Sequence, residues 1–313
     1  MSCPAIGVML PRDIDASRVR EFAVRAERLG FDELWVVEDL GFRGGIAQAG
    51  VVLAVTERIR VGIGILPAGA RNAAFAAMEL ATLAQLFPGR VDAGIGHGMP
   101  DWMRSVGAWP ERPLRALERH VTTVRTLLAG GTVGDGVRLD ATSVPSEAPP
   151  LLLGVRGPRS LALSGRIADG TVLAEPVTPE YARAALGQIA ASDHRIVAYN
   201  VGSVDADAAA ALAAARPALQ AIGEPDWAPH IAPLPFADEF AALRSRCADG
   251  AEFAREMPDE WVAQLALAGT PSEVRARIEA LAVAGVHSSV FLPVGDPVAA
   301  LESLATILRP AAE

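Results

Sequence analysis

The stretch from residue 58 to 99 constrains the fold more than any other part of the chain. It reads RIRVGIGILPAGARNAAFAAMELATLAQLFPGRVDAGIGHGM. The apolar, β-branched run 59–66 predicts a buried strand, the apolar residues after it recur at helical spacing, and 91–95 predicts a second buried strand. A helix between two strands makes them parallel, so both strands end at the same edge of one sheet.

Glycines interrupt both of these strands. Gly62 and Gly64 lie in the first, and Gly94, Gly96 and Gly98 lie in or just after the second. A glycine inside a strand often marks a place where a ligand or another backbone approaches closely. The sequence therefore predicts main chain without side-chain cover at this edge, where a flat ligand can bind.

The rest of the chain repeats the same alternation of strand and helix. Further strands are predicted at 5–9, 34–37, 151–155, 171–174, 195–201 and 287–292. Eight such units in 313 residues are the number expected of a (β/α)8 barrel, which we expect to be a single domain over residues 1–313. The alternative is an open doubly wound sheet, but the glycines are spread over several strand ends and none spells GxGxxG between a strand and a helix.

Two segments interrupt the alternation. Residues 203–258 hold an alanine-rich helix and then a stretch rich in Pro, Trp and acidic residues, which we interpret as an insertion over the barrel mouth without an independent core. Residues 100–113 form a predicted loop with Trp102 and Trp109, a wall for a pocket or simply packed loop aromatics.

Composition narrows the class of protein. A hydrophobic content of 51% supports a large core, and a net charge of −9 gives no basic surface for nucleic acid. No run of about 18 apolar residues is present, so no membrane span is expected. Cys3 and Cys247 have neither disulfide-framework nor metal-site spacing, so we expect no metal and a location in the reducing cytoplasm.

Three ordered motifs resemble one family. GIGILPAGAR with the later GRVDAGIGHG resembles the third and fourth strands of the bacterial luciferase-like superfamily of flavin- and deazaflavin-dependent oxidoreductases. LLLGVRGPRSLALSGRIADGTVLA resembles its fifth and sixth strands, and LALAGTPSEVRARIEALAVAGVHSSVFLPVGDP its closing segment, so that most of residues 5–310 is covered. The resemblance implies a barrel that holds the cofactor ring at its C-terminal mouth, a small-molecule substrate and a homodimer. It also implies a non-prolyl cis peptide, which falls at Gly64-Ile65.

The candidate cofactor-binding residues follow several strand ends. Gly157-Pro158-Arg159-Ser160 opens a helix after a strand, where free N–H groups, the helix dipole and an Arg can hold a phosphate; the alternative is a tight turn. Arg71 anchors a phosphate or substrate, or forms a surface ion pair. The predicted cofactor-binding residues are Gly64, Ile65, Arg71, Gly96, Gly98, Gly154, Gly157, Pro158, Arg159 and Ser160.

The candidate catalytic residues are Glu38, Asp39 and His97. Glu38 and Asp39 end the second strand and can orient the ring or a substrate, or can cap the following turn; Asp39 matches an acidic position of deazaflavin-using relatives. His97 lies between two glycines, where an accessible imidazole can shuttle a proton, or can bond to a nearby carbonyl.

The sequence departs from the family at the acid–base positions. Some deazaflavin-dependent relatives have a His directly after the strand-two Asp and a Glu after the strand-four glycines, and Leu40 and Met99 occupy these places here. The common Asn-Pro after the third strand is replaced by Pro67-Ala68. That acid–base pair is therefore not inherited.

The function that we predict is hydride transfer between coenzyme F420 and an organic substrate. F420 is favoured over FMN because of the loop 38–45 and the overall similarity to reductases of that branch. The alternatives are an FMN-dependent monooxygenase, a cofactor-binding homologue without turnover, and an unrelated barrel isomerase or aldolase acting on a phosphorylated sugar. The chain contains no Lys, which excludes a Schiff-base lysine but not a proton-transfer isomerase.

Overall fold

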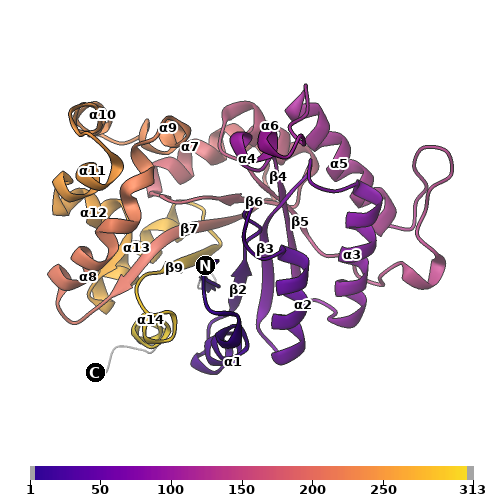
Figure 1. The fold of residues 1–313 in the computed structure, drawn as a ribbon, viewed down its shortest axis with the longest axis horizontal. Helices are drawn as coiled ribbons and strands as arrows, with labels where there is room; N and C mark the ends of the chain where they lie inside the picture. The colour runs from indigo at the N-terminus through magenta and orange to yellow at the C-terminus, as the bar shows by residue number, and fades with distance from the viewer. Residues whose placement is uncertain (1–3, 309–313) are drawn as a thin grey trace.

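Eight parallel strands close into a barrel in the computed structural model, which describes residues 4–308 (Figure 1). They are β1 (Ala5–Met9), β2 (Glu33–Val36), β3 (Arg60–Pro67), β4 (Val91–Gly96), β5 (Leu151–Gly154), β6 (Gly170–Leu173), β7 (Arg195–Val204) and β9 (Ser288–Pro293). Each pairs with the next, and β9 pairs with both β7 and β1. The eight predicted strands and the barrel are confirmed, and the open sheet is excluded because the ring closes.

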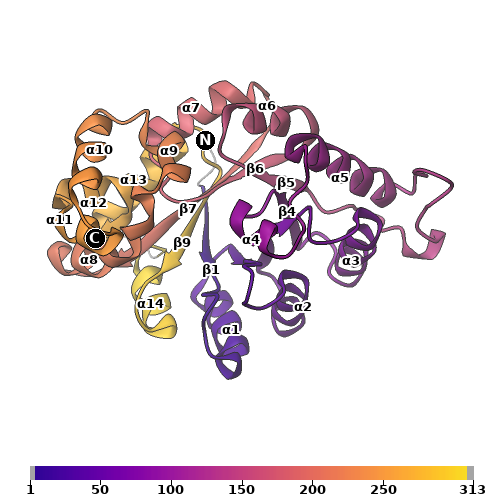
Figure 2. The ribbon, with the colours of Figure 1, turned by 45° about the horizontal axis from the view of Figure 1, so that its top comes forward.

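Helices surround the barrel (Figures 1 and 2). The outer helices are α1 (Val19–Leu29), α2 (Gly45–Val55), α3 (Ala73–Leu86), α5 (Pro113–Leu128), α6 (Pro158–Ile167), α7 (Pro179–Ile189), α13 (Pro271–Val283) and α14 (Pro297–Leu304). The last five begin with a proline, whose fixed φ and missing N–H suit the first helical position. Residues 100–113 are not wholly a loop, because α4 (Pro100–Ser105) lies within them.

The insertion lies beside the barrel, beyond β7, in both views (Figures 1 and 2). It contains α8 (Ala208–Ala215), η3 (Arg216–Gly223), η4 (Pro225–Trp227), α9 (Ala228–Ile231), α10 (Ala237–Arg246), α11 (Gly250–Glu256) and α12 (Asp259–Leu265), and then β8 (Leu267–Gly269), which pairs with the far end of β7. It thus runs past residue 258.

The insertion has a hydrophobic cluster of its own, so the expectation of a segment without an independent core is wrong. Its helices bring enough large apolar side chains together to exclude water, among them Leu219, Phe240, Phe253 and Val262. Phe240 and Phe253 meet edge to face with ring centroids 5.0 Å apart.

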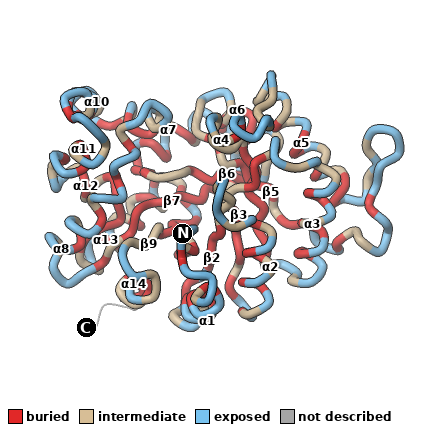
Figure 3. The backbone as a smooth tube through the Cα atoms, viewed as in Figure 1, coloured by how far each residue is buried: buried red, intermediate tan, exposed pale blue. Residues whose placement is uncertain are grey.

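The N-terminal end of the barrel is closed by charged and aromatic side chains. Arg195 donates to Asp92 at 2.8 Å and pairs with Glu33, while the Trp35 indole N–H donates to Glu33 at 2.8 Å. A Cβ atom on Gly62 would lie under 3.0 Å from the Trp35 ring, so this glycine makes room for the indole. Figure 3 shows that burial is concentrated along the strands and the inner faces of the helices. Because the N-terminal end of the barrel is closed, we expect the site at the opposite end, the C-terminal mouth.

Within the described residues, no helix combines the length and the apolar character needed to cross a bilayer.

Candidate active site

The end of β3 forms the centre of the mouth. The peptide bond between Gly64 and Ile65 is cis, as the resemblance implied, and the pairing of β3 with β4 shifts in register between Ile63 and Leu66. The Ile65 side chain covers neighbouring glycines: an added Cβ would lie 3.1 Å from it at Gly94 and at Gly96. The expectation of uncovered main chain is therefore wrong here, because half-buried Ile65 fills that space.

Gly154 on β5 belongs to the same contact. A Cβ there would lie under 3.0 Å from Ile65 Cγ2. Gly98 has φ +73°, in the left-handed region, and a Cβ there would lie 3.0 Å from Met103 of α4. The glycines at the strand tips thus lie together at one mouth. Because they have no side chains, neighbouring side chains such as Ile65 and Met103 fit against them and form much of the surface of the mouth.

Tyr199 of β7, in the barrel interior beneath the mouth, is a residue that the sequence reasoning missed. A Cβ on Gly64 would meet its hydroxyl at under 3.0 Å. Tyr199 is only 4% exposed, and its hydroxyl has no hydrogen-bond partner within residues 4–308. Burial, together with the charges of Glu33 and Glu175, raises its pKa well above the ordinary value, so the phenol stays protonated. The sequence signal for Tyr199 was the alternation along β7, because Arg195, Val197 and Tyr199 share the face of the strand that points into the barrel.

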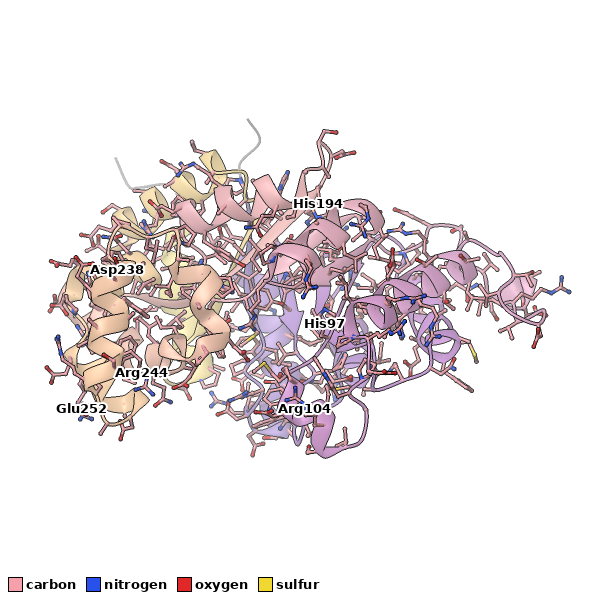
Figure 4. The ribbon with its side chains drawn as sticks, turned by 90° about the horizontal axis from the view of Figure 1, so that it is seen from above. His97, Arg104, His194, Asp238, Arg244 and Glu252 are labelled. Carbon is pink, nitrogen blue, oxygen red and sulfur yellow. The ribbon has the colours of Figure 1, made fainter. Side chains whose placement is uncertain are left out.

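His97 and Ser160 come together at the mouth. Figure 4 shows His97 from above, near the centre of the molecule. His97 follows β4 directly, and its Nε2 atom lies 3.4 Å from Ser160 Oγ near the start of α6. Burial lowers the pKa of His97, which keeps the imidazole neutral at pH 7. Trp109 lies beside it, with the ring centroids 6.4 Å apart.

The first turn of α6 offers donors to an anion. Gly157 is the N-cap and provides no capping side chain, Pro158 is the first helical residue, and exposed Arg159 follows. The guanidinium of Arg159 forms no ion pair with any described residue. Backbone N–H groups at a helix start together with an Arg are a donor set that fits a phosphate.

Glu38 and Arg71 bind each other. The two Arg71 η-nitrogens each lie 2.9 Å from a Glu38 oxygen, and the Gly45 N–H, the first of α2, donates to Glu38 at 2.7 Å. This pair joins the loops after β2 and β3. Asp39 lies apart from it, paired with Arg12 at 2.7 Å.

Glu175, at the mouth, is a second residue that the sequence reasoning missed. It follows β6, is half-buried, and precedes Pro176 through a cis peptide. Burial raises the pKa of its carboxyl and outweighs the hydrogen bond from its own backbone N–H, which lowers it; Arg156 and Arg12 also lower the pKa, and Asp39 raises it. The sequence signal for Glu175 was a carboxylate just after a buried strand, the same pattern that indicated Glu38 and Asp39 as candidate catalytic residues.

A cavity of about 560 Å³ lies away from the mouth, inside the insertion, where Ile222, Ile231, Phe240 and Arg244 are among its lining residues. The chemistry-bearing side chains do not line it, so we place the candidate site at the mouth.

A family model described as luciferase-like monooxygenase matches residues 2–288. The chain is 29% identical over 300 residues to a 5,10-methylenetetrahydromethanopterin reductase of Methanolobus tindarius, which covers 90% of each chain. It is 32% identical over 181 residues to an F420-dependent glucose-6-phosphate dehydrogenase of Nakamurella multipartita, which covers 52% of this chain and 53% of that one.

Solved structures share the fold. The coenzyme F420-dependent tetrahydromethanopterin reductase of Methanopyrus kandleri superposes with a TM-score of 0.79 at 22% identity, over 97% of this chain and 98% of that one. The oxygenating constituent of 3,6-diketocamphane monooxygenase from Pseudomonas putida, in complex with FMN, gives a TM-score of 0.72 at 16% identity, over 98% of this chain and 97% of that one.

Proposed function

Since this chain belongs to the luciferase-like monooxygenase family, we propose that it is an oxidoreductase that transfers hydride between coenzyme F420 and a small organic substrate. The observation that carries the proposal is its similarity, over half its length at 32% identity, to a dehydrogenase whose name states F420 dependence. The second relative, similar over 90% of the chain, is by its name a reductase, 5,10-methylenetetrahydromethanopterin reductase of Methanolobus tindarius.

The residues at the mouth fit such a cofactor. The start of α6, from Gly157 to Ser160, fits the phosphate. Half-buried Ile65 gives the ring an apolar support, and the unpartnered Tyr199 hydroxyl is a buried donor that a polar atom of a ligand would satisfy. When bound, the deazaflavin supplies or accepts the hydride.

The chain's own residues bind, orient and exclude water. Arg159 offsets the phosphate charge, and Ile65 with its glycine bed keeps water from one face of the ring. His97, neutral at pH 7, offers a hydrogen bond at the ring or substrate. Glu38 forms an ion pair with Arg71, and Asp39 forms one with Arg12; these pairs fix the loops that border the mouth.

FMN-dependent monooxygenation is the second candidate, favoured by the FMN-containing structural neighbour. The α6 donors suit the FMN phosphate as well, so the donor set at this helix does not separate the two cofactors.

Titration of the purified full-length chain with F420 and with FMN, followed by absorbance and fluorescence, tests the proposal. We expect F420 to saturate at a concentration at least tenfold lower than FMN, a difference of about 1.4 kcal/mol. We also expect oxidation of reduced F420 with at least one member of a panel of aldehydes, imines and conjugated enones. Tighter binding of FMN supports the monooxygenase; binding without any turnover supports a non-catalytic homologue; and binding of neither refutes the family-based function.

A homodimer is part of the proposal, because α3 exposes an apolar row to solvent. Phe75, Met78 and Leu86 are 64%, 50% and 65% exposed along one side of the helix, and Val51 of neighbouring α2 is 43% exposed. Large apolar side chains exposed on neighbouring helices favour this surface as an interface with a second subunit. Sedimentation equilibrium should give a dimer for the natural chain and a monomer for Phe75→Glu.

A further inference from the structure

The loop after β6 is fixed by its main chain. The Trp227 indole N–H donates to the Glu175 carbonyl at 2.9 Å, and His230 Nδ1 lies 3.1 Å from the Pro176 carbonyl. Asn200 completes the arrangement, accepting from the Val177 N–H at 2.8 Å and donating to the Val177 carbonyl at 3.2 Å. Three successive carbonyls are therefore held by side chains from the insertion and from β7.

The Glu175 carboxyl is left outside this arrangement. It forms no ion pair with any residue from 4 to 308. The nearby cations are engaged elsewhere: Arg12 binds Asp39, and Arg156 donates to the Asp226 carbonyl at 3.2 Å and lies 4.8 Å from the Trp227 ring centroid. The backbone of this loop is thus fixed by other residues, while the Glu175 carboxyl is held by no ion pair within residues 4–308.

Charged groups that follow several different strands lie at the same end of the barrel as Glu175. Arg12 follows β1, Asp39 follows β2, Arg156 follows β5 and Tyr199 lies on β7, and each of them interacts electrostatically with Glu175. These groups come from different sides of the ring of strands. Glu175 itself follows β6, so it lies at the same C-terminal mouth of the barrel, where the ring and substrate are proposed to lie.

We infer that Glu175 is the catalytic acid of this site, taking the place of the acid–base residues that some deazaflavin-dependent relatives have where this chain has Leu40 and Met99. The inference rests on the proposed function. As a hydride bonds to an electrophilic carbon of the substrate, the electron pair of the C=O, C=N or conjugated C=C bond moves to its far atom. Glu175 gives that atom its proton and is reprotonated from solvent; in substrate oxidation the carboxylate accepts the proton instead.

The surroundings suit this role. Burial and Asp39 raise the pKa of Glu175, which increases the fraction of the acid form near neutral pH, the form that can donate. Tyr199 remains a protonated phenol and can hold the polar atom of the substrate next to Glu175.

The test compares full-length Glu175→Gln and Glu175→Asp with Glu180→Gln, a matched control on an exposed carboxylate in the first turn of α7. The first readout needs no substrate: infrared spectra recorded through a pH titration should show the carbonyl stretch of one carboxylic acid that persists above the ordinary pKa of a Glu side chain. This band should be lost in Glu175→Gln and kept in Glu180→Gln. F420 affinity should stay within about twofold in all three variants, because Glu175 is not part of the phosphate site.

The second readout is oxidation of reduced F420 with an acceptor found for the natural chain. Glu175→Gln should lower kcat by about 100-fold or more, the usual size of general acid catalysis, with little change in KM. In the natural chain kcat/KM should fall as pH rises through the pKa of Glu175, because the acid form is consumed. Glu175→Gln should lose this limb and Glu175→Asp should keep it at a lower rate.

The outcomes separate the two proposals. If the natural chain neither binds F420 nor turns it over, the proposed function fails and this inference fails with it. If the natural chain is active but Glu175→Gln keeps the same pH profile and rate, or the carboxylic acid band survives that substitution, only the inference about Glu175 is overturned.

Discussion

Gly154→Ala tests whether Ile65 depends on the glycine bed beneath it. The added Cβ would lie under 3.0 Å from Ile65 Cγ2, whereas carbon atoms in ordinary contact lie about 3.5–4.0 Å apart. Ile65 must therefore move by roughly 1 Å, against a β-branched χ1 that is stiff. The glycine backbone of β4 packs against the same side chain, since a Cβ added at Gly94 or Gly96 would lie only 3.1 Å from Ile65, so we expect Ile65 to shift toward the open mouth.

Overpacking of this kind costs about 1–3 kcal/mol. Urea unfolding should show that loss in Gly154→Ala, and F420 titration should show an affinity lower by about tenfold, because the displaced side chain enters the ring's place. Ile65→Ala removes Cγ2 and leaves Cβ, which lies 3.4 Å from the new methyl group, an ordinary contact. The double variant should therefore be no less stable than Ile65→Ala alone, a coupling of about 1–3 kcal/mol. Stability of Gly154→Ala equal to the natural chain, or strictly additive effects, would refute the proposed packing.

Three further predictions concern the loops, the insertion and the phosphate site. Glu38→Ala removes both hydrogen bonds from Arg71, which keeps Glu79 at 3.4 Å, and the partner of the first N–H of α2, so the free energy of unfolding should fall by about 1–3 kcal/mol. Exposed Glu57→Ala should change it by less than about 0.5 kcal/mol, and equal losses would contradict the role of the pair. Burial lowers the pKa of His230 to about 3, so its contribution to stability is complete above the unfolded pKa of about 6.5 and is lost toward pH 3, at up to about 1.4 kcal/mol per pH unit. Unfolding at pH 7 and pH 5 should show a shallower pH dependence in His230→Gln, and an unchanged slope would count against the buried neutral imidazole. Arg159→Ala should weaken F420 binding about tenfold and reduce its salt dependence, whereas Arg166→Ala, exposed in the last turn of the same helix, should do neither.

The sequence by itself determined the order of elements and the end of the barrel where the site lies. Apolar periodicity is a local property, so strands such as 59–66 and 91–95 and the proline-started helices could be recognised without knowing their neighbours. The predicted strand ends then placed His97, Gly157 and Ser160 at one mouth because parallel strands end together. The resemblance alone supplied the cis peptide at Gly64-Ile65.

Only the tertiary structure decided which side chains occupy that mouth. Ile65 covers Gly154, a residue 89 positions away, and Arg71 reaches Glu38 rather than remaining free for a ligand, and neither contact leaves a periodic trace in the sequence. The insertion, expected to lack a core, has its own hydrophobic cluster, and its Trp227 and His230 fix the loop that carries Glu175. Hydrogen bonds from segments more than 50 residues away fix the loop that carries Glu175, and burial raises the pKa of its carboxyl. Both effects depend on distances that exist only after the chain has folded.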